Sequence, residues 1–253
     1  MGVAIGDYDN SGRFSIFVTN FSEEYNALYH ADAAPKGGGA FTDVSWPSKT
    51  APSSLPYVGW GTTFFDYDND GLLDLYVVNG HVYPQLDKTK LGASAPYRQR
   101  RLLYHNRGDG TFDEVAAQAG PTLMTERVGR GAAVGDLDND GRLDLVINDL
   151  DGQPQVLHNE SASSGHWLMV SLTGKAPNTL AIGAIVTVRV GERRMQRLVQ
   201  SGSSYLSQDD MRLHFGIGAA ETIDEIDVRW PDDSHTTRKN VRANQPITFA
   251  QQP

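Results

Sequence analysis

The sequence contains no cysteine among its 253 residues. Disulfide frameworks, thiolate nucleophiles, zinc fingers with cysteine ligands and iron–sulfur sites are therefore excluded. It also contains no run of 18 apolar residues, and so no candidate transmembrane helix. The first seven residues lack the basic and apolar segments of a secretory leader, so we expect no targeting signal in the printed chain.

Basic residues are scarce as well. The chain has 22 Lys and Arg against 31 Asp and Glu, for a net charge of −9. Because like charges repel, we expect neither nucleic-acid binding nor insertion into an anionic membrane. Of the acids, 23 are Asp and 8 are Glu, and Asp favours turns and cation-binding loops over helices. The excess lies in residues 1–160, with a net charge of −10, whereas residues 161–253 have +1.

Self-comparison finds one motif three times in the acidic part. The copies span residues 2–12, 61–71 and 131–141, and alternating apolar segments follow at 14–20, 73–79 and 143–148. A third shared segment follows at 28–30, 102–106 and 156–159. The first two units then end in Phe41–Val44 and Phe112–Val115. Each complete unit therefore predicts four short strands, with an aspartate loop between the first two.

Four antiparallel strands at this spacing are typical of a β-propeller blade. Two units are complete and the third lacks its last strand, while closed propellers usually have about four to eight blades. We therefore expect the C-terminal part of a longer protein, or an open arc of blades capped by another domain. An unpaired blade face near Val3, Ile5 and Phe17 would then favour self-association through an open edge.

A second all-β pattern begins after the linker at 160–165. Six alternating segments between residues 166 and 250 predict a small β-sandwich-like domain. The expected fold class is therefore all-β, with about three propeller blades in residues 1–160 followed by a sandwich-like domain in 166–250. The Pro-, Gly- and Ser-containing stretch 84–101 predicts a surface insertion in the second unit.

The pattern Asp-x-Asp-x-Asp-Gly-x-x-Asp occurs in full in the second and third units. Alternate carboxylates converge on one point because the glycine permits a sharp turn, and a backbone carbonyl adds a further oxygen. Calcium is the expected ion, since it prefers six to eight oxygens in a tolerant geometry. The candidate ligands of the two sites are Asp66, Asp68, Asp70, the carbonyl of Leu72 and Asp74, and Asp136, Asp138, Asp140, the carbonyl of Arg142 and Asp144.

The first unit departs from this pattern because serines replace the later aspartates. Its candidate ligands are Asp7, Asp9, Ser11, the carbonyl of Arg13 and Ser15. The sequence leaves two alternatives for this loop: a third calcium site, or a loop that binds no cation. An EF-hand is excluded in the complete loops, since Val77 and Ile147 stand where its bidentate Glu would be. The alternative explanation, that Asp-Asn-Asp-Gly only makes a turn, does not account for four aspartates at one spacing in two loops.

These motifs resemble the FG-GAP/VCBS repeats of integrin-α-like propellers. The C-terminal segments 181–184, 202–208, 213–218 and 228–231 resemble an ASPIC/UnbV domain. Together they are similar to the cartilage-acidic-protein-like family, and the resemblance covers nearly the whole chain. It implies a secreted calcium-binding protein with no established enzymatic role.

Other chemistry-bearing residues favour structural roles. His30, His105 and His158 recur at one place in the repeat, which indicates architecture rather than catalysis. His81 lies in a loop, where a hydrogen-bonded turn and a ligand contact both stay open. Ser203 and Ser204 lack the Gly-x-Ser-x-Gly context of a hydrolase nucleophile.

The sequence thus favours a non-enzymatic extracellular or periplasmic module, with structural calcium in its loops and an unidentified protein or glycan as its ligand. The alternative is an enzyme, such as a hydrolase, or a biosynthetic accessory protein that uses the propeller as a scaffold. An enzyme would require a pocket of converging ionisable groups away from the aspartate loops.

Overall fold

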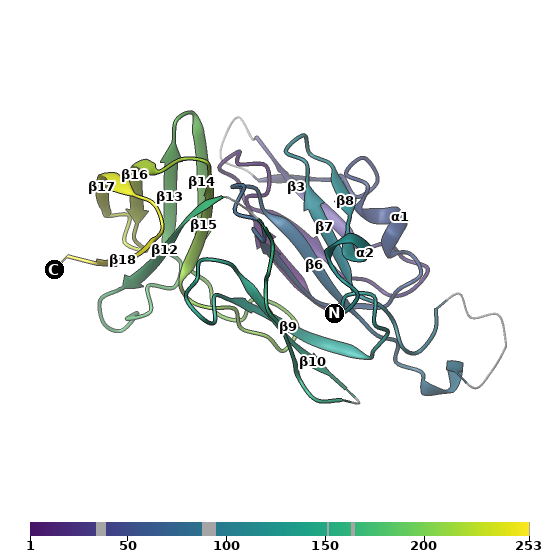
Figure 1. The fold of residues 1–253 in the computed structure, drawn as a ribbon. Helices are drawn as coiled ribbons and strands as arrows, with labels where there is room; N and C mark the ends of the chain where they lie inside the picture. The colour runs from purple at the N-terminus through teal and green to yellow at the C-terminus, as the bar shows by residue number, and fades with distance from the viewer. Residues whose placement is uncertain (34–38, 88–94, 151, 163–164, 253) are drawn as a thin grey trace.

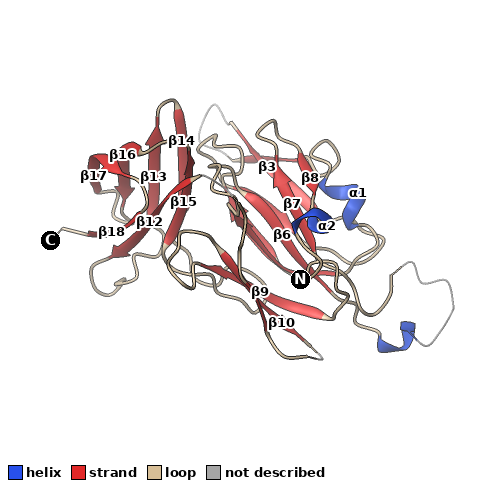
Figure 2. Ribbon diagram, viewed as in Figure 1, coloured by secondary structure: helices blue, strands red, loops and turns tan. Residues whose placement is uncertain are grey.

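The computed structural model describes residues 1–33, 39–87, 95–150, 152–162 and 165–252. Within them the fold is all-β and of the β-propeller type, with five sheets and few helical residues (Figures 1 and 2). Three sheets are built from the N-terminal repeats and two from the C-terminal region. In the described part of the chain, no helix is long and apolar enough to cross a membrane.

Each N-terminal sheet follows chain order, with antiparallel neighbours. The first sheet contains β1 (Val3–Gly6), β2 (Ser15–Val18), β3 (Ala27–Asp32) and β4 (Ala40–Asp43). The second contains β5 (Gly59–Phe65), β6 (Asp74–Asn79), β7 (Leu102–Asn106) and β8 (Phe112–Glu114). The third contains β9 (Gly129–Gly135), β10 (Asp144–Asp149) and β11 (Gln155–Leu157). The strands predicted for the three repeats are thus present, and among the described residues the third sheet has three strands, as predicted.

Neighbouring N-terminal sheets pack face to face through their apolar residues. One buried cluster joins Phe17 and Leu28 of the first sheet to Leu75 of the second, and another joins the second sheet to the third. The first strands β1, β5 and β9 lie side by side. Glycine permits this close approach, since a Cβ on Gly61 would lie 2.7 Å from the backbone nitrogen of Ala132.

Short helical segments connect these sheets. The helix α1 (Thr50–Ser54) follows β4, and α2 (Ala116–Ala119) follows β8. A 3-10 helix, η1 (Pro84–Asp87), begins the stretch for which a surface insertion was predicted. These segments are too short to show the periodicity by which a helix is predicted from sequence.

The C-terminal region forms two sheets that share one buried apolar cluster. One has the order β15-β12-β18, from β12 (His166–Thr173), β15 (Leu213–Gly218) and β18 (Gln245–Ala250). The other has the order β14-β13-β16-β17, from β13 (Ile185–Val190), β14 (Arg193–Leu198), β16 (Thr222–Arg229) and β17 (His235–Arg242). The sequence did not predict β17, because this exposed edge strand is mostly polar and lacks an alternating pattern.

Two expectations need correction. The stretch 84–101 is not a surface insertion throughout, since Gln99 and Arg101 are each 1% exposed and Arg101 lies 3.6 Å from Asp149; residues 88–94 lie outside the described part. Phe17 is fully buried, whereas Val3 and Ile5 are 43% and 40% exposed. Side chains alternate along a strand, so Phe17 pairs with Ala4 on the inner face while Val3 and Ile5 lie on the other.

Candidate metal centre

The three aspartate loops join the first and second strands of the N-terminal sheets: the first loop (7–15), the second loop (66–74) and the third loop (136–144). All three have the same backbone turn. Its asparagines, Asn10, Asn69 and Asn139, have φ values of 55°, 61° and 62°, and its glycines Gly12, Gly71 and Gly141 have 79°, 89° and 87°. Asn and Gly adopt this left-handed conformation at the lowest cost, which explains their place in the motif.

The first aspartate of each loop closes the turn. Asp66 Oδ2 accepts a hydrogen bond from the Gly71 amide at 2.8 Å, and Asp136 Oδ2 accepts one from Gly141 at 3.0 Å. Asp7 Oδ2 does the same with the Gly12 amide at 3.0 Å. The loop shape is thus maintained by one carboxylate and one backbone amide in every unit.

The second loop gathers carboxylates in a partly dry site. Asp66, Asp68 and Asp70 each offer an oxygen, and these oxygens lie within 4.8 Å of one another. Asp66 is only 1% exposed. Burial, together with the nearby charges of Asp74 and Asp70, raises the pKa of Asp66 well above its usual range. A cation at this point would neutralise the group and reverse that effect.

The third loop repeats this arrangement nearer to solvent. One oxygen each from Asp136, Asp138 and Asp140 again lie within 4.8 Å of one another. The Asp138 side chain is 52% exposed, against 24% for Asp68 of the second loop. Burial still raises the pKa of Asp136. Both complete motifs therefore form acidic clusters that can hold a metal ion.

The last aspartate of each complete loop bonds to the backbone in the third strand of its sheet or just after that strand. Asp74 accepts hydrogen bonds from the backbone amides of Tyr67 at 3.2 Å and Asn106 at 2.9 Å. Asp144 makes the equivalent bonds with Leu137 and Asn159, at 3.1 and 2.8 Å. Burial raises the pKa of Asp74 to about 7, so this carboxylate would also gain from a nearby cation.

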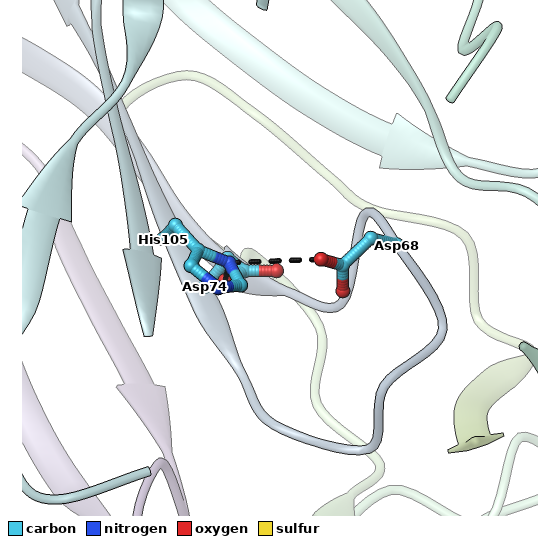
Figure 3. Close-up of side chains that lie close together, drawn as sticks. All are labelled: Asp68, Asp74 and His105. Carbon is cyan, nitrogen blue, oxygen red and sulfur yellow. Dashed lines mark ion pairs between the residues drawn. The ribbon is translucent and has the colours of Figure 1, made fainter. Parts of the chain in front are cut away.

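A histidine lies beside each complete loop. His105 Nδ1 lies 3.3 Å from Asp74 Oδ1 and 3.6 Å from Asp68 Oδ2 (Figure 3). His158 Nδ1 lies 3.0 Å from Asp144 Oδ1. The hydrogen bond to Asp74 raises the pKa of His105 to about 9. From the sequence, these histidines were expected to have a structural role, and their contact with the aspartate loops was not predicted. Their constant position in the repeat is the signal that indicates this contact.

The first loop keeps the turn but loses carboxylates. Ser15 Oγ accepts a hydrogen bond from the Ala31 amide at 3.1 Å, which corresponds to the bond that Asp74 makes with Asn106. Asp7 is fully buried, burial raises its pKa to about 6, and its Oδ1 has no hydrogen-bond partner among the described residues. The first loop thus has two aspartates, Asp7 and Asp9, and serines at the positions of the later aspartates.

The loops also contact one another. Asn10 Nδ2 of the first loop donates to the Gly71 carbonyl oxygen of the second at 3.0 Å. Asn69 Nδ2 of the second loop donates to the Gly141 carbonyl oxygen of the third at 3.1 Å. The motif asparagine therefore has two roles, since it adopts the left-handed turn and links its loop to the next.

The remaining candidates lie elsewhere. His81 is 4% exposed and accepts a hydrogen bond at Nδ1 from the Tyr83 amide at 3.2 Å. Burial and the charge of Arg130 lower the pKa of His81. Ser203 Oγ accepts a bond from the Asp209 amide, and Ser204 Oγ accepts one from the Thr62 amide of β5, each at 2.9 Å. Ser204 thus belongs to a contact between the C-terminal region and the second sheet, whereas the Ser203 bond lies within the C-terminal region.

Comparison with known proteins agrees with this architecture. Residues 7–77 and 93–147 match the FG-GAP-like repeat model, and residues 174–253 match the ASPIC and UnbV model. The chain is an FG-GAP repeat protein with a C-terminal ASPIC/UnbV domain. The resemblance inferred from the motifs is thereby confirmed.

Curated relatives include cartilage acidic protein 1 from Mus musculus and from Homo sapiens. Each is 27% identical to this FG-GAP and ASPIC/UnbV chain, over 245 and 252 residues respectively. The alignments cover 94% and 96% of this chain but 34% of each relative. The protein of the same name from Xenopus tropicalis is also 27% identical, over 241 residues. The chain thus spans about a third of the length of these relatives.

Proposed function

We propose that the second and third loops bind calcium, one ion each. The ligands would be Asp66, Asp68, Asp70, the Leu72 carbonyl and Asp74 in the second loop, and Asp136, Asp138, Asp140, the Arg142 carbonyl and Asp144 in the third. The observation that supports this most directly is the convergence of three carboxylates around the 1% exposed Asp66, because buried like charges are costly without a cation.

The donor chemistry favours calcium over other divalent ions. The convergent groups in each loop are carboxylates, and calcium takes oxygen ligands in a flexible shell, whereas zinc prefers nitrogen and sulfur. His105 with Asp68 and Asp74, and His158 with Asp138 and Asp144, also bring ligand atoms within 4.8 Å of one another. Because calcium prefers oxygen ligands, these histidines would act in this proposal as ion-pair partners of the aspartates and not as ligands. The first loop, with Asp7, Asp9, Ser11, the Arg13 carbonyl and Ser15, would be a third and weaker site.

The ions would be structural in this proposal. Calcium would neutralise the carboxylates, while the chain's own amides hold Asp66 and Asp74 in the loop. We assign the three N-terminal sheets as blades of one propeller in residues 1–160. The two C-terminal sheets, which share one core, form a sandwich in residues 166–250.

The overall function would be that of a non-enzymatic interaction module outside the cytoplasm, extracellular or periplasmic. The similarity to cartilage acidic protein 1, a name that refers to cartilage, supports an extracellular role. Net charge argues for a protein or glycan partner over nucleic acid. Calcium-stabilised blades would present their connecting loops to that partner, because binding residues are concentrated in loops on rigid scaffolds.

An enzyme or biosynthetic accessory protein is the second candidate. A groove of about 940 Å³ lies between the second and third sheets, and its lining includes Phe65, Leu145 and Leu157 together with His105 and His158. Both histidines also contact the aspartate loops. The groove therefore offers a site of mixed polarity for a small molecule, and its two histidines contact the proposed calcium centres.

Calorimetric titration of the chelator-treated chain with calcium tests the proposal. We expect binding at two or three sites, and the loss of one site in Asp70→Ala and in Asp140→Ala. The matched control is Glu126→Ala, which removes one negative charge from an exposed position outside the loops. Absence of calcium binding at millimolar concentration, or equal losses in all three variants, would contradict the assignment.

A further inference from the structure

The ASPIC/UnbV domain covers the same edge of the blades on which the aspartate loops lie. It contacts the second loop through the backbone amide of Gly218, which donates to the Asn69 carbonyl oxygen at 2.9 Å. The guanidinium of Arg193 in β14 donates to the carbonyl oxygen of Asp70 in the same loop. With its amide in the orientation that satisfies its neighbours, Gln196 of β14 donates to the Gly12 carbonyl oxygen of the first loop at 3.1 Å.

The third loop is contacted by two more side chains of this domain. Arg212 donates from Nη1 to Asn139 Oδ1 at 2.7 Å and from Nη2 to the Asp136 carbonyl oxygen at 2.8 Å. His214 Nε2 lies 3.1 Å from the Gly141 carbonyl oxygen. A carbonyl oxygen only accepts, so this nitrogen is the donor. All three loops therefore contact the domain.

These contacts depend on the shape of the loops more than on their charge. Their acceptors are backbone carbonyls and the side chain of Asn139, which belong to the left-handed turns described above. Such acceptors are in place only while the turn is formed. Four carboxylates within nine residues repel one another when no cation balances them, and this repulsion opposes the turn.

The domain also shields the second loop from water. Strand β15 passes so close to Asp66 that a Cβ on Gly216 would lie 2.1 Å from Asp66 Oδ2. Covering a carboxylate removes its hydration, which is costly unless a cation takes the place of water. Arg197 of the domain supplies one positive charge near Asp66 and offsets part of this cost. Because one guanidinium does not balance the four carboxylates of the loop, docking of the domain is still more favourable when the loop holds an ion.

We propose that Arg193, Arg212 and His214 are positioning residues for the calcium loops, so that calcium binding and attachment of the ASPIC/UnbV domain reinforce each other. This inference rests on the calcium sites proposed above. By linkage, a domain that favours the ion-bound loop raises its affinity for calcium, and calcium strengthens the domain contact by the same factor.

A second contact zone of the same domain provides an internal reference. Ser207 Oγ accepts a hydrogen bond from the Ala132 amide at 3.0 Å, and Asp209 Oδ1 accepts one from the Val134 amide at 2.9 Å. The Asp210 amide donates to the Val134 carbonyl oxygen at 2.8 Å. These bonds lie on β9 and not on the loops, so calcium should affect them less.

Amide hydrogen exchange tests whether calcium strengthens the contact between the domain and the loops. The Gly218 amide reports the loop contact, and the Asp210 amide reports the reference zone. We expect chelation to speed exchange at Gly218 by about tenfold or more relative to Asp210, and calcium to restore it. Unchanged exchange at Gly218, or slower exchange after chelation, would overturn the proposal. If calcium does not bind at all, the calcium sites themselves are wrong.

Calorimetry of domain variants tests whether the domain contact raises the affinity of the loops for calcium. Arg193→Ala and Arg212→Ala should each weaken calcium binding by about two- to tenfold, the worth of a hydrogen bond or two. Arg193→Lys keeps a cationic donor and should recover part of the loss. The control is Arg189→Ala on the adjacent strand β13, an exposed residue whose guanidinium lies 3.9 Å from Glu225. If the Arg193 and Arg189 variants bind calcium with equal affinity while the unaltered chain binds it normally, the coupling between calcium and the domain is refuted. The proposed calcium sites are not.

Discussion

The first and second aspartate loops have the same backbone and different chemistry. Both have an asparagine and a glycine at positive φ, and both close the turn through a bond from the glycine amide to the first aspartate. The second loop then adds Asp70 and Asp74, where the first has Ser11 and Ser15. The comparison separates two functions of the motif: Asp, Asn and Gly at its start define the shape, and the later aspartates provide the negative charge.

The second and third loops have matching sets of candidate ligands but different surroundings. Asp68 lies in a loop that has a neighbour on each side, because Asn10 contacts Gly71 and Asn69 contacts Gly141. Asp138 is in the last loop of the row, and its side chain is 52% exposed. The third loop is therefore more exposed than the second although the two motifs are the same, and the motif alone does not specify this difference.

The largest predicted difference between the first two loops concerns their last positions. In saturating calcium, Asp74→Ala should lower the free energy of unfolding by about 3 kcal/mol or more. It leaves the buried amides of Tyr67 and Asn106 without an acceptor, at about 1–3 kcal/mol each, and removes a ligand. Ser15→Ala removes only the bond from Ala31 and should cost about 1 kcal/mol.

Urea unfolding in calcium buffer measures both changes. Glu126→Ala again controls for the loss of one charge at an exposed site. Similar losses in Asp74→Ala and Ser15→Ala would show that the two loops do not differ in the way described. The two variants also test whether the strand contact or the calcium ligand contributes more to stability, because only Asp74 provides both.

A second prediction separates the third loop from the other two by its pH dependence. Burial lowers the pKa of His214 to about 4, while an unfolded histidine titrates near 6.5. Between these values the unfolded state binds more protons, so stability is present above pH 6.5 and is lost as the pH falls towards 4. The loss should reach about 1–2 kcal/mol by pH 5.

The variant His214→Gln keeps a donor near the Gly141 carbonyl and does not titrate. Its urea-unfolding free energy should therefore fall less steeply from pH 7 to pH 5 than that of the unaltered chain. The carboxylates titrate in both proteins, so only the difference between the two curves is informative. Parallel curves would mean that His214 does not remain neutral in the folded protein.

Most of the strands and the positions of the aspartate loops could be predicted from the sequence. Alternating apolar residues predicted the N-terminal strands, and repetition of the aspartate motif located the loops. The edge strand β17 was missed because its residues face solvent on both sides and have no alternation to detect. The buried Arg101 was missed since its partner, Asp149, is far away in the sequence.

The contacts of the ASPIC/UnbV domain with the loops were not predictable for a related reason. Arg193 and Arg212 lie in polar segments that, by composition, resemble ordinary solvated surface. Apart from the Asn139 side chain, their acceptors are backbone carbonyls of two loops more than 70 residues away, and a carbonyl has no signature in a sequence. Only the packing of β14 and β15 against the blades brings the two together.

A third prediction converts the first loop towards the second. Ser11→Asp with Ser15→Asp should tighten calcium binding at the first loop by about tenfold, because ligand charge tunes the affinity of such loops. The backbone turn is already formed, and Ser15 already occupies the place of Asp74 next to the third strand. Calorimetry with Asp70→Ala and Asp140→Ala in the background isolates this site. Unchanged or weaker binding would show that geometry limits the first loop.

The smallest predicted difference concerns the turn glycines. Gly12→Ala and Gly71→Ala both place an L side chain at positive φ, at a cost of about 1 kcal/mol. The methyl group on Gly12 would meet its nearest neighbour, Gln196, at 3.8 Å. On Gly71 it would overlap Arg193 Nη1 and would lie 3.1 Å from the Gly216 carbonyl oxygen, both in the ASPIC/UnbV domain. Gly71→Ala should therefore cost about 1 kcal/mol more by urea unfolding, since an overpacked contact must shift. Because the extra cost arises only where the domain covers the loop, equal costs would mean that β15 does not press on the second loop in solution.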